Sequence, residues 1–247
     1  MRQLRNLDKL KGYGLKASDG EIGSLRQVYF SDRSWKIRYL IVRTGKWLFG
    51  QEVLIVPSVI QHVDDEHKMI EVRLTLEQIK NSPRVEKQLP VSRHYEQEYY
   101  DYYGWEPYWT GDPLFDQTPK LPPKQDRDPP KQPEHPHLRS SDEVVGYHIH
   151  AQDGEIGQIK DLIVDDQDWT LRYLKIDTGH WLPGKKILVS TPWIQMIDWS
   201  ELMVRVDLTC HRIETAPEYD PDKPISRDYE LSLYKHYGKK IDPDGPE

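Results

Sequence analysis

The chain has 247 residues, of which 36% are hydrophobic and 30% are charged, and its formal net charge is −7. This acidic balance argues against nucleic acid as the main partner, because a phosphate backbone selects clustered Lys and Arg. The single cysteine excludes an internal disulfide and a cysteine-rich zinc site, and no segment approaches the roughly 18 apolar residues of a membrane span, so we expect a cytoplasmic protein without an integral membrane segment.

The first 75 residues have the pattern of a small β-domain. Residues 1–11 carry leucines three apart, which fits a short helical turn or a lead-in to a strand edge. From Gly12 the apolar period becomes two, and we expect six strands separated by turns. Their expected ranges are 13–17, 22–30, 36–43, 52–56, 60–63 and 69–74. Short strands at this spacing predict a small closed or nearly closed barrel.

Two helices are predicted after the last strand. Thr75 is a plausible N-cap for a helix over 76–80. Ser92 caps a second helical pattern that ends at Gly104. Tyrosines at 95, 99 and 103 lie four apart and therefore share one face of this helix. We expect that face to pack on the barrel.

The whole pattern returns 134 residues later. Asp19-Gly20-Glu21-Ile22-Gly23 is repeated as Asp153-Gly154-Glu155-Ile156-Gly157, and the offset holds without a gap from Gly12 and Gly146 to Gly104 and Gly238. Roughly two in five aligned positions are identical, which indicates an internal duplication. We expect the two copies to pair as a pseudo-dimer with a pseudo-twofold axis, with homodimerisation as a further option.

A proline-rich stretch over 105–139 separates the copies and is typical of an extended spacer. The predicted organisation is therefore a first module over 1–104, a linker with an aromatic anchor over 105–141, and a second module over 142–247. Repeated tryptophans are expected in the cores or between the modules; these are Trp35, Trp47, Trp169 and Trp181.

The Asp-Gly-Glu-Ile-Gly turn, the Arg38-Tyr39-Leu40 strand and the segment Leu54-Ile55-Val56-Pro57 resemble the PRC-barrel family. The resemblance covers 10–75 and 144–209 and implies a mainly β protein: two small PRC-type barrels with short flanking helices. The same barrel occurs in the photosynthetic reaction-centre H subunit and in the ribosome maturation factor. The resemblance thus implies docking onto a larger assembly rather than catalysis. The membrane helix of the first and the extra N-terminal domain of the second have no counterpart, so neither specific role is transferred.

The repeated carboxylates admit two interpretations. Asp19 with Glu21, and Asp153 with Glu155, could be acid–base pairs, which need convergent side chains in a sheltered cleft. We favour hairpin turns, because Asp-Gly is common where the backbone needs a positive φ. An acidic run could suggest a calcium loop, but its spacing fits an acidic turn better; it contains Asp161, Asp165, Asp166 and Asp168.

Two further candidates are weaker. His148 and His150 share one face of a strand and could pair on a metal, with His135 and His137 upstream, but the first copy has Gly14 and Lys16 instead. Cys210 replaces an apolar residue of the first copy, which favours a buried inert thiol over a nucleophile. We therefore predict that the protein binds no cofactor and is not an enzyme.

The aromatic residues in which the copies differ are the best candidates for a partner surface. They are Tyr102, Trp105, Tyr108, Trp109, Trp193 and Trp199. The leading hypothesis is a non-enzymatic interaction or scaffold module that presents a composite face to a protein partner. The alternative is a small-molecule or ion-binding module that uses the crevice between the barrels.

Overall fold

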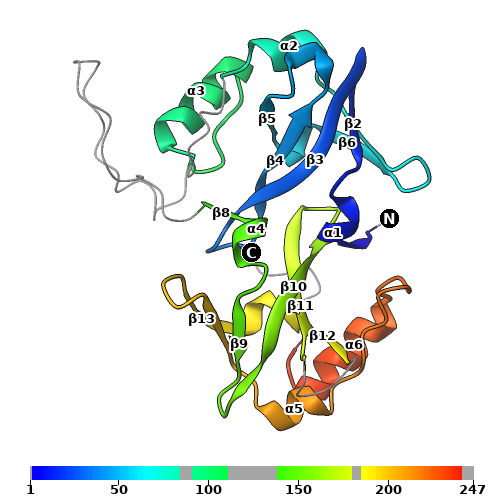
Figure 1. Ribbon diagram of the computed structural model, residues 1–247, viewed down its shortest axis with the longest axis vertical. Coiled ribbons are helices and arrows are strands. Elements are labelled where there is room, and N and C mark those ends of the chain that lie inside the picture. Colours follow the sequence, from blue (N-terminus) through cyan, green and yellow to red (C-terminus); the bar gives the residue numbers. More distant parts are fainter. Residues whose placement is uncertain (1, 84–90, 111–137, 180–184, 241–247) are drawn as a thin grey trace.

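The computed structural model describes residues 2–83, 91–110, 138–179 and 185–240 (Figure 1). Most of the predicted spacer lies outside the described residues, as do His135, His137, Trp181 and the C-terminal tail. The fold is mainly β and contains two seven-stranded sheets of the same topology.

The first sheet is formed by β2 (Gly14–Ala17), β3 (Gly20–Ser31), β4 (Ile37–Thr44), β5 (Glu52–Ile55), β6 (Ile60–Asp64) and β7 (Met69–Val72). Its order is β5-β4-β3-β2-β7-β6, and only the β2–β7 pair among these strands is parallel. The six predicted strands are confirmed. The ends of the path, β5 and β6, are joined directly by the 3-10 turn η2 (Pro57–Val59), so the strands wrap around one apolar core.

The predicted helices are also confirmed. α2 (Leu76–Asn81) begins with a capping box formed by Thr75 and Gln78. α3 (Arg93–Tyr103) begins at Ser92, whose hydroxyl accepts a hydrogen bond from Tyr95 N, and Gly104 ends it in the left-handed region at φ 66°. Tyr99 on the predicted stripe is fully buried, and its hydroxyl donates to Leu54 O at 2.8 Å. The stripe therefore attaches α3 to the sheet.

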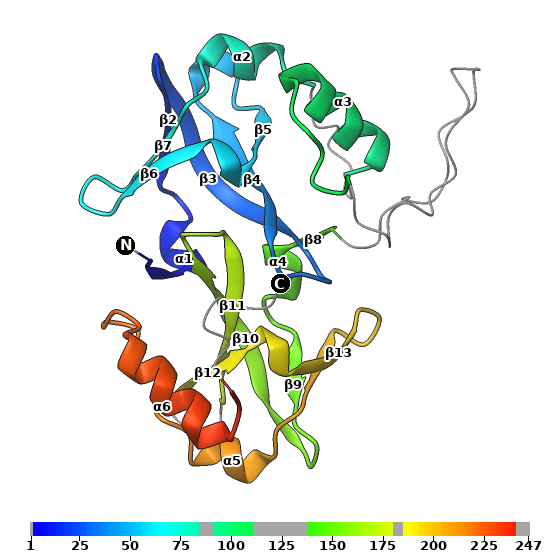
Figure 2. The same ribbon diagram turned by 180° about the vertical axis from the view of Figure 1, so that it is seen from behind.

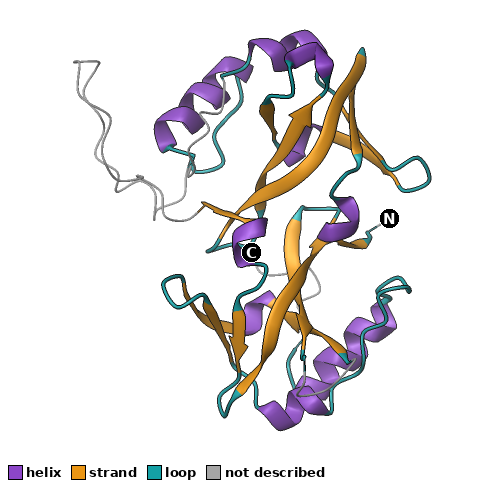
Figure 3. Ribbon diagram, in the orientation of Figure 1, coloured by secondary structure: helices purple, strands orange, loops and turns teal. Residues whose placement is uncertain are grey.

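The second sheet repeats this order as β12-β11-β10-β9-β14-β13. Its strands are β9 (His148–His150), β10 (Glu155–Asp165), β11 (Thr170–Asp177), β12 (Lys186–Ser190), β13 (Ile194–Asp198) and β14 (Met203–Val206). The short elements η3 (Thr191–Trp193) and α5 (Cys210–Glu214) and the longer helix α6 (Arg227–Tyr237) take the places of η2, α2 and α3, and η1 (Lys46–Leu48) follows β4 in the first half. Helices α2 and α3 lie at one end of the molecule, and α5 and α6 lie at the other (Figure 3).

Each half contributes its lead-in segment to the other half. β1 (Leu4–Asn6) pairs with β10, and β8 (Leu138–Ser140) pairs with β3, in matching registers. The short helices that follow, α1 (Leu7–Leu10) and α4 (Ser141–Val144), pack on the same strands, β10 and β3 respectively. Both views show α1 and α4 at the junction between the halves (Figure 2). The predicted boundaries at 1–104, 105–141 and 142–247 did not include this exchange.

The two sheets also meet at the start of β4 and β11. Lys36 and Thr170 form an antiparallel bridge. Ile37 N donates to Trp169 O and Leu171 N donates to Trp35 O, both at 2.8 Å. These positions are equivalent under the 134-residue offset, so the contact has the symmetry of a pseudo-twofold axis through the bridge. Within the described residues, backbone hydrogen bonds thus join the halves at three places.

Candidate functional site

The repeated aspartates of the Asp-Gly-Glu-Ile-Gly motif accept hydrogen bonds from the first turns of helices. Asp19 Oδ1 accepts from Leu76 N at 2.8 Å, and Asp153 Oδ1 accepts from Cys210 N at 2.7 Å. Each carboxylate therefore satisfies a free amide in the first turn of the helix that follows the last strand. The motif is structural, as predicted, although the sequence did not reveal the helix as its target.

The second glycine in each copy of the motif is needed for close packing. Gly20 does not have the positive φ that we predicted; a Cβ there would lie 2.8 Å from Leu76 Cδ1. At Gly23 a Cβ would lie 2.0 Å from Arg43 O on β4, and at Gly157 it would lie 2.1 Å from a carbonyl oxygen on β11. Two paired strands approach too closely at this point for any side chain.

The acidic run of the second half binds the exchanged N-terminal segment. Asp165 Oδ2 accepts from Arg2 Nε at 2.6 Å, and Asp166 Oδ2 accepts from Arg5 Nε at 2.8 Å. Asp161 Oδ1 accepts the amide of Asp8 at 3.0 Å, and burial raises the pKa of Asp161. Among the described residues no group of three or more His, Cys, Asp or Glu side chains could hold a metal ion. These carboxylates are engaged in joining the halves.

His148 and Cys210 have local acidic neighbours. His148 Nδ1 lies 2.7 Å from Glu155 Oε1, and His150 lies two residues along the same strand. Cys210 is half-buried rather than fully buried. Burial and the neighbouring Asp153 carboxylate raise the pKa of the Cys210 thiol to about 11. A thiol of this pKa is a poor nucleophile near neutral pH.

The six candidate aromatics lie in three places rather than on one surface. Tyr102, Trp105, Tyr108 and Trp109 gather on α3 and the loop after it, where Trp105 stacks on Tyr103 with 4.2 Å between the ring centroids. Trp193 is buried beneath α6, 4.8 Å from the Tyr237 ring.

Trp199 lies in the turn between β13 and β14, where the Arg139 guanidinium is 3.8 Å from its ring centroid. Its counterpart in the first half is Asp65, which accepts hydrogen bonds from Arg5 and Tyr13. Each arginine also forms an ion pair with an equivalent aspartate, Asp166 or Asp32, but the turn residue beside it is a carboxylate in one half and an aromatic ring in the other.

Two buried glutamates were missed by the sequence analysis. Tyr39 OH donates to Glu96 Oε1, and Tyr173 OH donates to Glu230 Oε1, both at 2.8 Å. Their repetition in both helices was the available signal, because a charged side chain kept beside a buried aromatic stripe indicates a buried polar pair. Burial raises the pKa of Glu96.

The second partners of the two glutamates differ. Glu230 receives a two-pronged contact from the exchanged Arg2, with Nη1 to Oε2 at 2.9 Å and Nη2 to Oε1 at 3.2 Å. Glu96 accepts instead from Tyr108 OH at 3.0 Å, and Arg93 Nη1 lies 3.3 Å from its Oε2. Tyr108, in the aromatic loop after α3, thus contacts the buried glutamate of the first half, whereas Arg2 contacts the buried glutamate of the second half.

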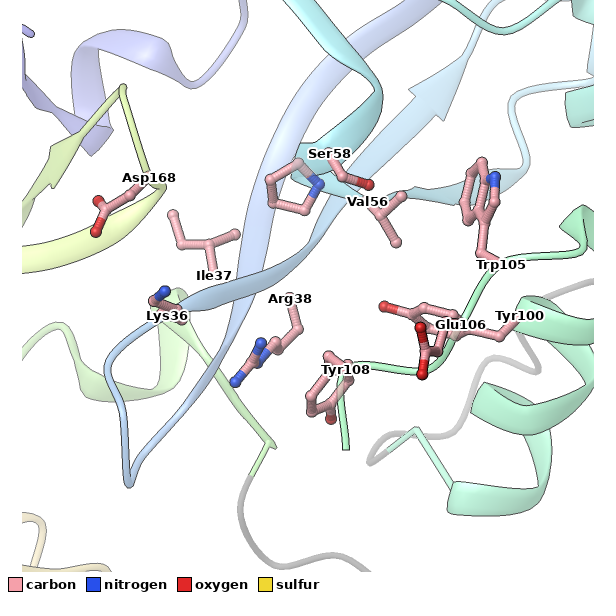
Figure 4. A pocket seen from close by; sticks show the side chains of 11 residues that line it. Lys36, Ile37, Arg38, Val56, Ser58, Tyr100, Trp105, Glu106, Tyr108 and Asp168 are labelled. Carbon is pink, nitrogen blue, oxygen red and sulfur yellow. The ribbon is translucent and has the colours of Figure 1, made fainter. Parts of the chain in front are cut away.

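A pocket of about 270 Å³ opens beside this loop (Figure 4). Its walls come from the start of β4, η2, α3 and the following loop, and Asp168 of the second half stands at one end. Arg38 and Tyr108 lie side by side in it, with the guanidinium carbon 3.9 Å from the ring centroid. The site can therefore present a cation and an aromatic face to a bound group.

Comparison with known proteins supports the class that the fold defines, a mainly β protein with two similar sheets. Residues 7–79 match the family model of the PRC-barrel domain. The chain therefore contains a PRC-barrel domain in its first half, and the shared strand order suggests a second PRC-like domain in the other. No curated protein matches the chain. Within the described ranges, no helix is long and apolar enough to cross a membrane.

Proposed function

We propose that this chain is a non-enzymatic protein-interaction module, in which two joined PRC-type sheets present a composite surface to a larger protein assembly. The observation that carries the proposal is the asymmetry of the exposed surface. Leu202 in the β13–β14 turn is 51% exposed and occupies the position of Lys68 in the first half. Met196 on β13 is also exposed and occupies the position of His62.

This asymmetry favours a partner, because duplication would otherwise leave two equivalent polar turns. Both turn residues, Lys68 and Leu202, have the same left-handed conformation with φ 52°, so the fold tolerates lysine at this place. Leucine therefore has no advantage over lysine for the turn itself, whereas exposed apolar side chains are typical of contact surfaces. Phe49, which is 89% exposed after η1, is a second such residue, in the first half.

The polar residues that the copies share support a non-enzymatic role. Asp19 and Asp153 accept helix amides, and Glu96 and Glu230 are buried against tyrosines. A catalytic carboxylate must reach a substrate from a cleft. These four carboxylates are committed to packing instead.

The alternative function, a small-molecule or ion-binding module, is favoured by one observation. The pocket beside Arg38 is lined from both halves, by Lys36 of the first and Asp168 of the second. A ligand there would bridge the junction.

Site-specific photo-cross-linking in the source cells tests the proposed function. The photoreactive residue p-benzoylphenylalanine replaces Leu202 in one variant and Lys68, the matched control, in another. We expect a discrete protein adduct from position 202 and none from position 68. Adducts of equal yield at both positions, or none at position 202, would contradict the proposal.

A further inference from the structure

Arg38, near the start of β4, and its counterpart Arg172 on β11 have different charged surroundings. Arg172 Nη2 donates to Asp168 Oδ2 at 2.8 Å, and its Nε lies 3.3 Å from Asp165 Oδ2. In the first half, the positions of these two aspartates are held by Ser34 and Ser31. The duplicated arginine therefore has two carboxylates in one half and two hydroxyl-bearing residues in the other.

Arg38 consequently has unused hydrogen-bonding capacity. Its Nη2 reaches Ser34 Oγ only at 3.4 Å, and its buried Nε has no hydrogen-bond partner. No ion pair joins Arg38 to a carboxylate of the described residues. A buried guanidinium N–H without an acceptor lowers stability, so an incoming acceptor would be stabilised at this place.

Two of the three acids that surround Arg38 already have other contacts. Glu96 accepts from two tyrosines at Oε1, and its Oε2 faces Arg93 at 3.3 Å without a hydrogen bond. The positive charges of Arg93 and Arg38 partly offset the rise in the pKa of Glu96 that burial causes. Asp168 binds Arg172 and also accepts from Thr170 Oγ1 at 2.8 Å. Glu106, on the loop, is exposed and lines the pocket. Neither of the first two carboxylates can turn to Arg38 without breaking its own contacts.

A second cation lies at the same pocket. Lys36 lines it and has no ion pair among the described residues, whereas its counterpart in the second half is the uncharged Thr170. Lys36 and Arg38 thus face a space of about 270 Å³ (Figure 4). The rings of Tyr100, Trp105 and Tyr108 line this space as well, together with the acidic residues Glu106 and Asp168 at its margins. Aromatic walls lower the local polarity, and this strengthens a charge-assisted hydrogen bond.

We propose that this pocket binds the carboxylate of an acidic side chain in a peptide segment of the protein partner. Arg38 donates from its guanidinium to the carboxylate oxygens, as a guanidinium fork does with a carboxylate. Lys36 supplies the second positive charge, and Trp105 contacts the apolar stem of the acidic side chain. The bound carboxylate takes the role that Asp165 and Asp168 have in the other half. This inference rests on the proposed function, since it names the chemistry by which a partner is recognised.

The test is the binding of a rhodamine-labelled hexaglutamate peptide, measured by fluorescence anisotropy at low ionic strength with the full chain. We expect saturable binding that Arg38→Gln weakens about tenfold or more, because a desolvated charge pair is lost. The charge-matched control Arg26→Gln alters an exposed arginine on β3 and is expected to change the affinity less than about threefold.

A second variant adds the missing carboxylate, so that the test does not depend on the correct folding of Arg38→Gln alone. Ser34→Asp gives Arg38 the partner that Asp168 gives Arg172, so the chain stays folded and hexaglutamate binding falls about tenfold. Gln158→Glu adds the same charge to an exposed position of the second half and leaves the affinity within about threefold. Hexaglutamine does not bind.

Three outcomes overturn the inference: no binding of hexaglutamate to the native chain, equal binding by the Ser34→Asp variant, or displacement of the peptide by an equimolar amount of inorganic phosphate. The last would assign the pocket to phosphate groups instead. None of these outcomes contradicts the proposed function, because cross-linking from position 202 tests a different surface, in the second half.

Discussion

Replacing Arg2 by alanine is predicted to loosen the junction between the halves. Arg2 Nε lies 2.6 Å from Asp165 Oδ2, and its two terminal nitrogens contact both oxygens of Glu230 at 2.9 and 3.2 Å. The two acidic side chains are only 2% and 5% exposed. Truncation therefore leaves two buried carboxylates without their main cation.

The expected cost follows from the burial of each partner. Breaking a buried ion pair on one side costs about 3–5 kcal/mol. Arg2 itself is 33% exposed, and Arg172 and Arg227 remain 3.3 and 3.6 Å from the two acids, so we expect about 2–3 kcal/mol here. For a chain of this size that corresponds to a fall in Tm of roughly 4–12 °C.

Thermal and urea unfolding, followed by far-UV circular dichroism, measure the effect. Arg26→Ala, which removes an exposed arginine of β3, is the matched control and is expected to change the free energy of unfolding by less than about 0.5 kcal/mol. A double-mutant cycle with Glu230→Gln should show coupling of at least about 1 kcal/mol. Equal stabilities of the Arg2→Ala and Arg26→Ala variants would refute the reasoning, because the exchanged segment would then contribute nothing.

Three further predictions concern single sites. Gly23→Ala should lower the free energy of unfolding in urea by about 3 kcal/mol or more, because the new Cβ would lie 2.0 Å from a carbonyl oxygen of β4. Gly45→Ala is the control and should be tolerated, because the nearest atom to its Cβ would be 3.6 Å away. Similar losses of stability in the two variants would refute this prediction. Iodoacetamide should alkylate Cys210 at pH 8 about a hundredfold more slowly than a free thiol, and Asp153→Asn should speed the reaction, because the carboxylate helps to raise the thiol pKa. Since burial raises the pKa of Glu96, its contribution to stability is complete below the pKa of an unfolded glutamate and is lost as the pH rises through the folded value. The native chain should thus lose stability relative to Glu96→Gln as the pH rises above the ordinary pKa of glutamate, and the opposite trend would contradict the burial of this acid.

The local structure was predictable because its signals lie within a few residues. The period of two placed the six strands, and Thr75 and Ser92 placed the starts of the two helices. The offset of 134 residues established that the second half repeats the first. Each of these features depends on neighbours along the chain or on simple comparison of the copies.

The exchange of lead-in segments between the halves could not be predicted from the sequence in the same way. β1 would meet an equivalent strand edge on either half, and the choice of β10 depends on how the halves are joined. Arg2 and Asp165 are 163 residues apart, so their ion pair has no local signal. The lack of a carboxylate partner for Arg38 is evident only from a comparison of its surroundings in the structure with those of Arg172.

The pairing of β4 with β11 at the pseudo-twofold bridge is the central claim, because the shared pocket and the composite surface both depend on it. Lys36 and Thr170 are a non-hydrogen-bonded antiparallel pair, flanked by the 2.8 Å bonds of their neighbours. Such pairs have Cα atoms about 4.5 Å apart, within the range that a disulfide spans.

The most direct measurement is therefore a disulfide trap. In a Cys210→Ser background, Lys36→Cys with Thr170→Cys should oxidise within one chain, and peptide mapping by mass spectrometry should recover the cross-linked pair. Lys36→Cys with Ser200→Cys is the control and should stay reduced under the same conditions. Failure of the 36–170 pair to oxidise while the chain remains folded, or equal oxidation of both pairs, would contradict the joined arrangement of the two halves.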